Sequence, residues 1–166
     1  PHPRPLPRRC CLLLPGLLPA ALAMGSAPAA LAQEEGILRK RAETESFLRQ
    51  AAAYLEQVGI EQALAAFNAP QGRFVAGERY VFCYRLDGTV LAHGGNPALL
   101  GRNLGALRDA RGKPFAATLI RIAVTQGEGW LTYDWINPVS RQTEIKDTFI
   151  MRLREDLICS AGHYRG

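Results

Sequence analysis

GWLTYDWINP, residues 129–138, holds both tryptophans of the chain and has the alternation of a β-strand. Successive side chains of a strand leave on opposite faces of the sheet. One face would carry Leu131, Tyr133 and Trp135, and the other Trp130, Thr132 and Asp134. Proline cannot donate to a strand ladder, so Asn137-Pro138 ends the strand. We therefore expect one strand with two aromatic side chains on the same face.

A return strand that begins near Lys146 would bring an ammonium group close to Tyr133 and Trp135. Two rings with polar edges and one cation can line a small pocket for an anion. The alternative is that these rings simply fill the core of the domain. Trp130 points to the opposite face in either case and is expected to be structural.

The rest of the chain predicts helices before this strand and further strands around it. Phe47, Ala51 and Leu55 recur at four-residue steps, as on one face of a long helix, and Asp87-Gly88 is a hairpin signal. Helices are expected at residues 34–57, 60–67 and 115–126, and strands at 79–85, 90–93, 130–136, 146–153 and 157–162. This order predicts an α+β fold, a PAS-like five-stranded antiparallel sheet with a long N-terminal helix and a helical crossover.

The N-terminus has the composition of an export signal. Arg4, Arg8 and Arg9 precede an apolar run over residues 10–23, and Ala30-Leu31-Ala32 resembles a small-x-small cleavage site. The run is broken by prolines and is shorter than the roughly 20 residues that a spanning helix needs. We expect a signal peptide at residues 1–32 and one domain at residues 33–166, periplasmic or secreted and without a further membrane span. An uncleaved membrane anchor is the alternative.

Charge and cysteine content argue against several classes of protein. The formal net charge is +5, and three of the basic residues belong to the predicted signal. No basic block with interleaved aromatic residues occurs, so nucleic acid is not an expected partner. The histidines are scattered and no Cys-x-x-Cys motif is present, so neither a metal nor a cofactor is expected. Cys83 and Cys159 both lie in predicted strands. The sequence is compatible with a disulfide between them and with two separate buried thiols.

Together, the motifs of the chain resemble an extracellular Cache domain of the single-Cache type 2 group. The resemblance rests on YVFCYRLDGTVLAH at residues 80–93, Asn96-Pro97, GRNL at 101–104, Asp109 with GKPF at 112–115, and the segment from Gly127 through Lys146 to Tyr164. It covers about the whole of residues 33–166. The order and spacing of the pieces carry the resemblance, because each piece alone is weak.

The resemblance implies a sensing module that binds a small organic acid, an amino acid or a related metabolite on the membrane-distal sheet and signals through a partner protein. Two departures from the family pattern stand out. Gly94-Gly95 follows His93 where proline is usual, and Phe149 stands where tyrosine is common, which would remove one ligand hydrogen bond. Because no membrane helix or kinase follows the sheet, the chain resembles a stand-alone exported Cache protein.

Five residues are candidates for ligand binding: Lys146, Tyr133, Trp135, His93 and Tyr80. Lys146 can hold a carboxylate, and its alternative role is a solvated charge at a strand end. Tyr133 and Trp135 offer hydrogen-bond donors from the phenol and the indole. His93 ends a predicted strand, where it either contacts a ligand or stabilises the turn. Tyr80 is expected on the same face as two other aromatic residues of its strand.

Two other functions compete with sensing. A hydrolase would need Ser140 or Ser160 together with His93 or His163, but the chain has no Gly-x-Ser-x-Gly motif, and an enzyme is not expected. A structural or dimerisation subunit would pair through the helix at residues 34–57 and keep the pocket closed. A homodimer of this kind is also compatible with sensing.

Overall fold

The computed structural model describes residues 27–105 and 107–165. Its elements are helices α1 (Ala27–Val58), α2 (Ile60–Asn68) and α3 (Phe115–Gln126), the short 3-10 helix η1 (Pro97–Leu99), and strands β1 (Val75–Ala76), β2 (Arg79–Tyr84), β3 (Val90–His93), β4 (Glu128–Ile136), β5 (Thr143–Arg154) and β6 (Leu157–Tyr164). Residues 1–26 of the predicted signal peptide lie outside the described residues. The predicted cleavage site, residues 30–32, falls within α1.

The strands form one antiparallel sheet in the order β1-β2-β6-β5-β4, with β3 also paired to β2. The predicted α+β fold and its five long strands are confirmed. The sheet has six strands rather than five, because the two-residue β1 pairs with the start of β2. Two residues are too few to show the alternation by which a strand is recognised in a sequence.

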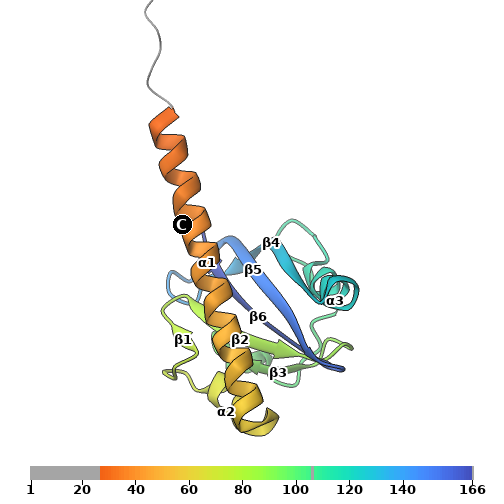
Figure 1. Ribbon diagram of the computed structural model, residues 1–166. Helices are drawn as coiled ribbons and strands as arrows, with labels where there is room; N and C mark the ends of the chain where they lie inside the picture. Colours follow the sequence, from red (N-terminus) through yellow and green to blue (C-terminus); the bar gives the residue numbers. More distant parts are fainter. Residues whose placement is uncertain (1–26, 106, 166) are drawn as a thin grey trace, which may run out of the picture.

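Helices cover both faces of the sheet. On the face that we call the α1 face, Leu48, Leu55 and Phe67 pack against Val81 and Phe149. On the opposite α3 face, Leu119 and Phe115 pack against Phe82, Tyr133 and Ile150. Figure 1 shows α1 crossing the sheet and α3 lying beside β4. The strand alternation therefore places one set of side chains against the long helix and the other set beneath the crossover.

Helix α1 begins seven residues before the predicted start, at Ala27. Alanine and leucine have high intrinsic helix propensity, so the segment before residue 34 continues the helix. The N-terminal turns of α1 extend past the sheet (Figure 1), and Leu31 and Leu38 are 60% and 58% exposed there. No helix among the described residues has both the length and the apolar character needed to span a bilayer.

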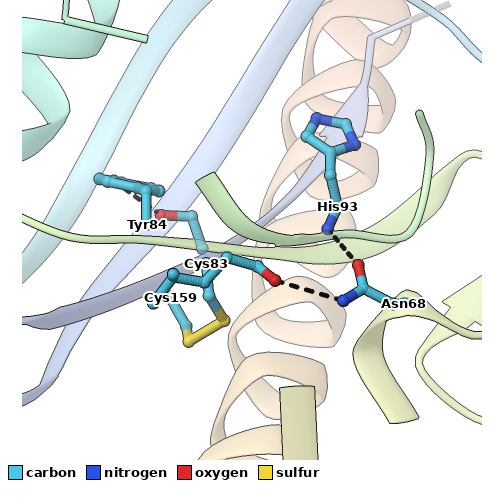
Figure 2. The surroundings of a disulfide bond; sticks show 7 residues. Asn68, Cys83, Tyr84, His93 and Cys159 are labelled. Carbon is cyan, nitrogen blue, oxygen red and sulfur yellow. Dashed lines mark hydrogen bonds between the residues drawn. A yellow bond between two sulfur atoms is a disulfide. The ribbon is translucent and has the colours of Figure 1, made fainter. Parts of the chain in front are cut away.

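Cys83 and Cys159 form a disulfide, which settles the question that the sequence left open. The two residues are direct partners in the register of β2 and β6, so their side chains leave the sheet on the same face. Figure 2 shows this bond together with Asn68, which closes α2. The Asn68 side chain donates to the Leu91 carbonyl and accepts from the His93 amide, at 3.2 and 2.9 Å. The end of α2 is thereby fixed to β3.

Candidate ligand-binding site

A cavity of about 290 Å³ lies between the end of β3 and the β4–β5 hairpin. Tyr80 of β2, His93 of β3, Trp135 of β4 and Arg141 of the hairpin all contribute to its wall. The structure thus brings three of the five predicted residues together, although they come from three different strands. Gly95, Asn96, Pro97, Ile136 and Pro138 complete the wall.

Gly95 allows the Tyr80 ring to take its position in the wall. A Cβ atom at residue 95 would lie 2.5 Å from Tyr80 Cε1, which no side chain could accommodate without movement of the ring. At Gly94, a Cβ atom would lie 2.7 Å from Val75 Cγ2 and 3.1 Å from the Phe67 carbonyl oxygen. Of the glycine pair that departs from the family pattern, Gly95 therefore makes room for the aromatic wall of the cavity, and Gly94 lets β3 end close to Val75 and Phe67.

His93 is a neutral hydrogen-bond donor. Its Nδ1 accepts a hydrogen bond from the Asn96 amide at 2.9 Å, so the proton of the neutral ring is on Nε2. Burial, and then the positive charge of Lys146, lower the pKa of His93 to about 3. The turn-stabilising role expected for His93 is thus present, since Nδ1 accepts from the turn after β3. Its ring is part of the cavity wall, and its contact with a ligand stays a prediction.

Lys146 lies directly behind this wall. Its side chain is fully buried, and Nζ donates to Tyr80 Oη at 2.8 Å. Burial lowers the pKa of Lys146 to about 7, and the negative charge of Glu78 acts in the opposite direction. A Cβ atom at Gly162 would lie 2.5 Å from Lys146 Cε, so this glycine provides the space for the lysine stem. The alternative of a solvated charge at a strand end is wrong for Lys146.

Tyr133 shares the face of Lys146 but lies apart from this cavity. Its ring stacks on Phe115 with the centroids 4.6 Å apart, and its hydroxyl accepts from Thr148 at 3.3 Å. Tyr133 lines a second hollow of about 250 Å³ beside the crossover. The charged side chains there are engaged with each other and with the backbone: Arg111 pairs with Asp134, and the Lys113 ammonium donates to the Thr132 carbonyl.

Arg141 is a wall residue that the sequence reasoning missed. It is exposed and has a φ of 62°, in the left-handed region. The hairpin that holds it is closed by a hydrogen bond from the Arg141 amide to the Asn137 carbonyl, at 2.9 Å. The only sequence signal was the turn after Asn137-Pro138. A turn signal shows where the chain changes direction, but it does not show which side chain reaches the cavity.

The expected role of Phe149 is wrong. Phe149 is the direct partner of Trp130 in the β4–β5 register, and the two rings pack on the α1 face with centroids 5.1 Å apart. Side chains alternate along β5, so the face that carries Lys146 cannot also carry Phe149. The missing hydroxyl at this position therefore removes nothing from the cavity. The structural role expected for Trp130 agrees with this packing.

The sequence profile of the Cache domain matches residues 59–158. The chain belongs to the Cache domain family. The match includes the sheet strands that supply the cavity wall and does not include α1, and the resemblance stated from the sequence motifs is confirmed. No curated relative matches the chain by sequence.

Solved structures of chemotaxis proteins share the fold of this Cache domain. A methyl-accepting chemotaxis protein from Vibrio parahaemolyticus RIMD 2210633 superposes with a TM-score of 0.71 at 23% identity, over 82% of this chain and 96% of that one. The periplasmic sensor domain of a chemotaxis protein gives 0.58 at 23% identity, with 82% and 96% covered. A Cache chemosensory domain solved for its recognition of carboxylic acid gives 0.59 at 17% identity, with 85% and 99% covered. At these identities the likeness supports the fold alone.

Proposed function

We propose that this Cache domain is an exported, periplasmic sensor module that binds a small organic acid in the cavity between β3 and the β4–β5 hairpin. The observation that carries the proposal is the charge of the side chains around the cavity. The wall holds the His93 ring, the Trp135 indole and the Arg141 guanidinium, and none of the described wall residues is acidic. The Lys146 ammonium lies immediately behind Tyr80.

A carboxylate is the chemistry that these groups fit. Ionised donors form shorter and stronger hydrogen bonds to carboxylates than neutral donors do. Lys146, behind the wall, is fully buried, and the low dielectric constant there strengthens its attraction for an anion. The apolar part of the acid would lie against the Trp135 ring. The Cache chemosensory domain solved with a view to carboxylic acid recognition has the same fold, which supports this choice of ligand class.

The signal would leave through α1 and pass to a partner protein. On α1, the Lys40 ammonium donates to the Tyr164 carbonyl at 2.8 Å, and Tyr164 is the direct partner of Lys146 in the β5–β6 register. Ligand binding that favours one arrangement of Tyr164 and Lys146 would therefore also favour one position of the helix. A homodimer through the exposed apolar residues of α1 is compatible with this output.

Hydrolysis is not proposed, because the two candidate serines are engaged elsewhere. The Ser140 hydroxyl donates to Glu144, and the Ser160 hydroxyl is bonded to Tyr84 at 3.2 Å. Neither bond places a histidine next to the serine oxygen. A serine nucleophile needs a base within hydrogen-bond reach.

Isothermal titration of the purified protein against C2 to C5 carboxylic acids and amino acids tests the proposal. We expect at least one acid to bind. Trp135→Ala and His93→Gln should each weaken the binding of that acid by about 1–3 kcal/mol, the cost of losing one buried contact. Lys113→Met is the matched control, because Lys113 lies in the second hollow and should leave the affinity unchanged. Folded protein that binds no member of the panel would contradict the proposal.

A further inference from the structure

Lys146 is a buried ammonium group without an acidic partner. Its single hydrogen bond within the described chain goes to Tyr80 Oη, at 2.8 Å. The salt bridges found among residues 27–105 and 107–165 do not include Lys146. Burial disfavours the charged form of an amine unless an opposite charge compensates for the lost hydration. No salt bridge among the described residues therefore compensates the charged form of Lys146.

Aromatic rings form the immediate surroundings of the amine. The ring centroids of Tyr80, Phe82 and Tyr164 lie 4.1, 5.0 and 5.3 Å from Lys146 Nζ. The negative face of an aromatic ring attracts a cation. This attraction offsets only part of the cost of burial, because the pKa of Lys146 still falls to about 7.

The ionisable groups that face Lys146 are neutral, with Glu78 as the acidic exception. From β3, His93 is kept neutral by a pKa lowered to about 3. From β4, burial raises the pKa of the Tyr133 phenol well above its usual range, and from β6 burial likewise raises the pKa of the Tyr164 phenol. Glu78, from the turn between β1 and β2, accepts from the Tyr164 amide at 3.2 Å and from Asn137 Nδ2 at 3.1 Å.

We propose that an organic anion entering the cavity is bound together with one proton, which Lys146 takes up from solution. In the free protein near neutral pH, the amine exchanges between its charged and neutral forms. A negative charge in the cavity, one side chain away from Nζ, favours the charged form. This inference rests on the proposed function and specifies its regulation, since the sensor would respond to the concentration of the acid anion and to acidity together.

The direction and size of the pH dependence follow from linkage. Bound anion raises the proton affinity of Lys146, so binding is strongest below pH 7 and weakens above it. Between about pH 6 and pH 8, Lys146 loses most of its proton in the free protein but keeps it in the complex. The apparent Kd for the acid should therefore rise about tenfold over this range. Carboxylic acids stay ionised over this range, as His93 stays neutral, so the change belongs to Lys146.

Lysine NMR on the unmodified protein tests the first half of the proposal without a ligand. The chain contains only three lysines, Lys40, Lys113 and Lys146, so ¹³Cε labelling gives three signals. Lys40→Arg and Lys113→Arg, both away from the cavity, assign them. We expect the Lys146 signal to titrate near pH 7. A Lys146 signal that shows no titration between about pH 6 and pH 8 would overturn the proposal.

Titration with propionate and succinate, and then with the remaining C2 to C5 acids, tests the second half. A bound acid should move the Lys146 midpoint upward by at least one pH unit. Calorimetry at pH 7.5 in buffers of different ionisation enthalpy should report the uptake of more than half a proton for each acid molecule that binds. An acid that binds without proton uptake and without moving the midpoint would overturn the inference and leave the proposed function intact. Absence of binding by every acid would remove the proposed function, and the inference with it.

Discussion

Arg141 occupies a backbone conformation that favours glycine. Its φ of 62° costs a side chain with a Cβ roughly 1 kcal/mol, and strain of this kind tends to persist where the side chain has a function. We expect Arg141→Gly to raise the free energy of unfolding by about 0.5 kcal/mol, since glycine's greater freedom in the unfolded chain offsets part of the relief. Affinity for the bound acid should fall, because the cavity loses its exposed cation. Chemical denaturation and calorimetry measure the two effects.

Gln142→Gly is the control for Arg141, since among the described residues Arg141 alone has a positive φ without being glycine. The control should lower stability and leave affinity unchanged. Equal affinity in Arg141→Gly and the unmodified protein would show that the guanidinium plays no part in binding.

The sequence predicted which side chains lie near the cavity better than it predicted which of them line the wall and which lie behind it. Strand alternation placed Tyr133 and Trp135 on one face, and the expected return strand brought Lys146 near them, as the structure has them. It did not distinguish the cavity wall from the layer behind it, because that depends on which neighbour intervenes: Tyr80 stands between Lys146 and the cavity, and Phe115 covers Tyr133. Arg141 was missed because nothing in the alternation pattern reports the conformation of a hairpin turn.

At the scale of elements, α1 is held to the sheet by a buried polar contact. Thr44 is fully buried and donates to the Lys40 carbonyl at 2.8 Å. Its oxygen also lies within hydrogen-bond distance of His163 Nδ1, 2.9 Å away. Thr44→Val keeps the shape but leaves that ring nitrogen without its partner, so we expect the free energy of unfolding to fall by about 1–3 kcal/mol. Urea denaturation measures the loss.

Ser46→Ala is the matched control on the same helix, because Ser46 is exposed. Its effect should stay within about 0.5 kcal/mol. A Thr44→Val variant as stable as the control would mean that His163 does not depend on this hydroxyl.

Elements in which apolar side chains recur at regular spacing were predictable from the sequence, but the residues at which they begin and end were not. Residues 115–126 are helical as expected, since apolar side chains recur at helical spacing and Gly127 follows. Strand β5 begins three residues before the predicted start, at Thr143, because pairing with β4 continues to Ile136. That extension depends on a partner strand, which local sequence does not contain.

At the scale of the whole molecule, the disulfide joins the two halves of the sheet that form the cavity. Cys83 belongs to β2, close to Tyr80 and His93, whereas Cys159 belongs to the β4–β6 half that supplies Trp135 and Arg141. The two cysteines are 76 residues apart in the chain. A cross-link that closes a loop of this length restricts the unfolded chain and typically adds about 2–4 kcal/mol to stability.

We therefore expect reduction to lower the free energy of unfolding of the protein by about 2–4 kcal/mol. Urea denaturation with and without dithiothreitol measures the difference, and mass spectrometry confirms that the thiols are free. A Cys83→Ala/Cys159→Ala variant should not respond to the reductant, which separates loss of the bond from other effects of the reagent. Acid binding should also weaken on reduction, because the two sides of the cavity then lose their covalent link and are held by strand pairing and by side-chain contacts such as the Lys146–Tyr80 hydrogen bond. A protein whose midpoint and affinity are unchanged after complete reduction would show that the β2–β6 ladder holds the cavity together without the bond.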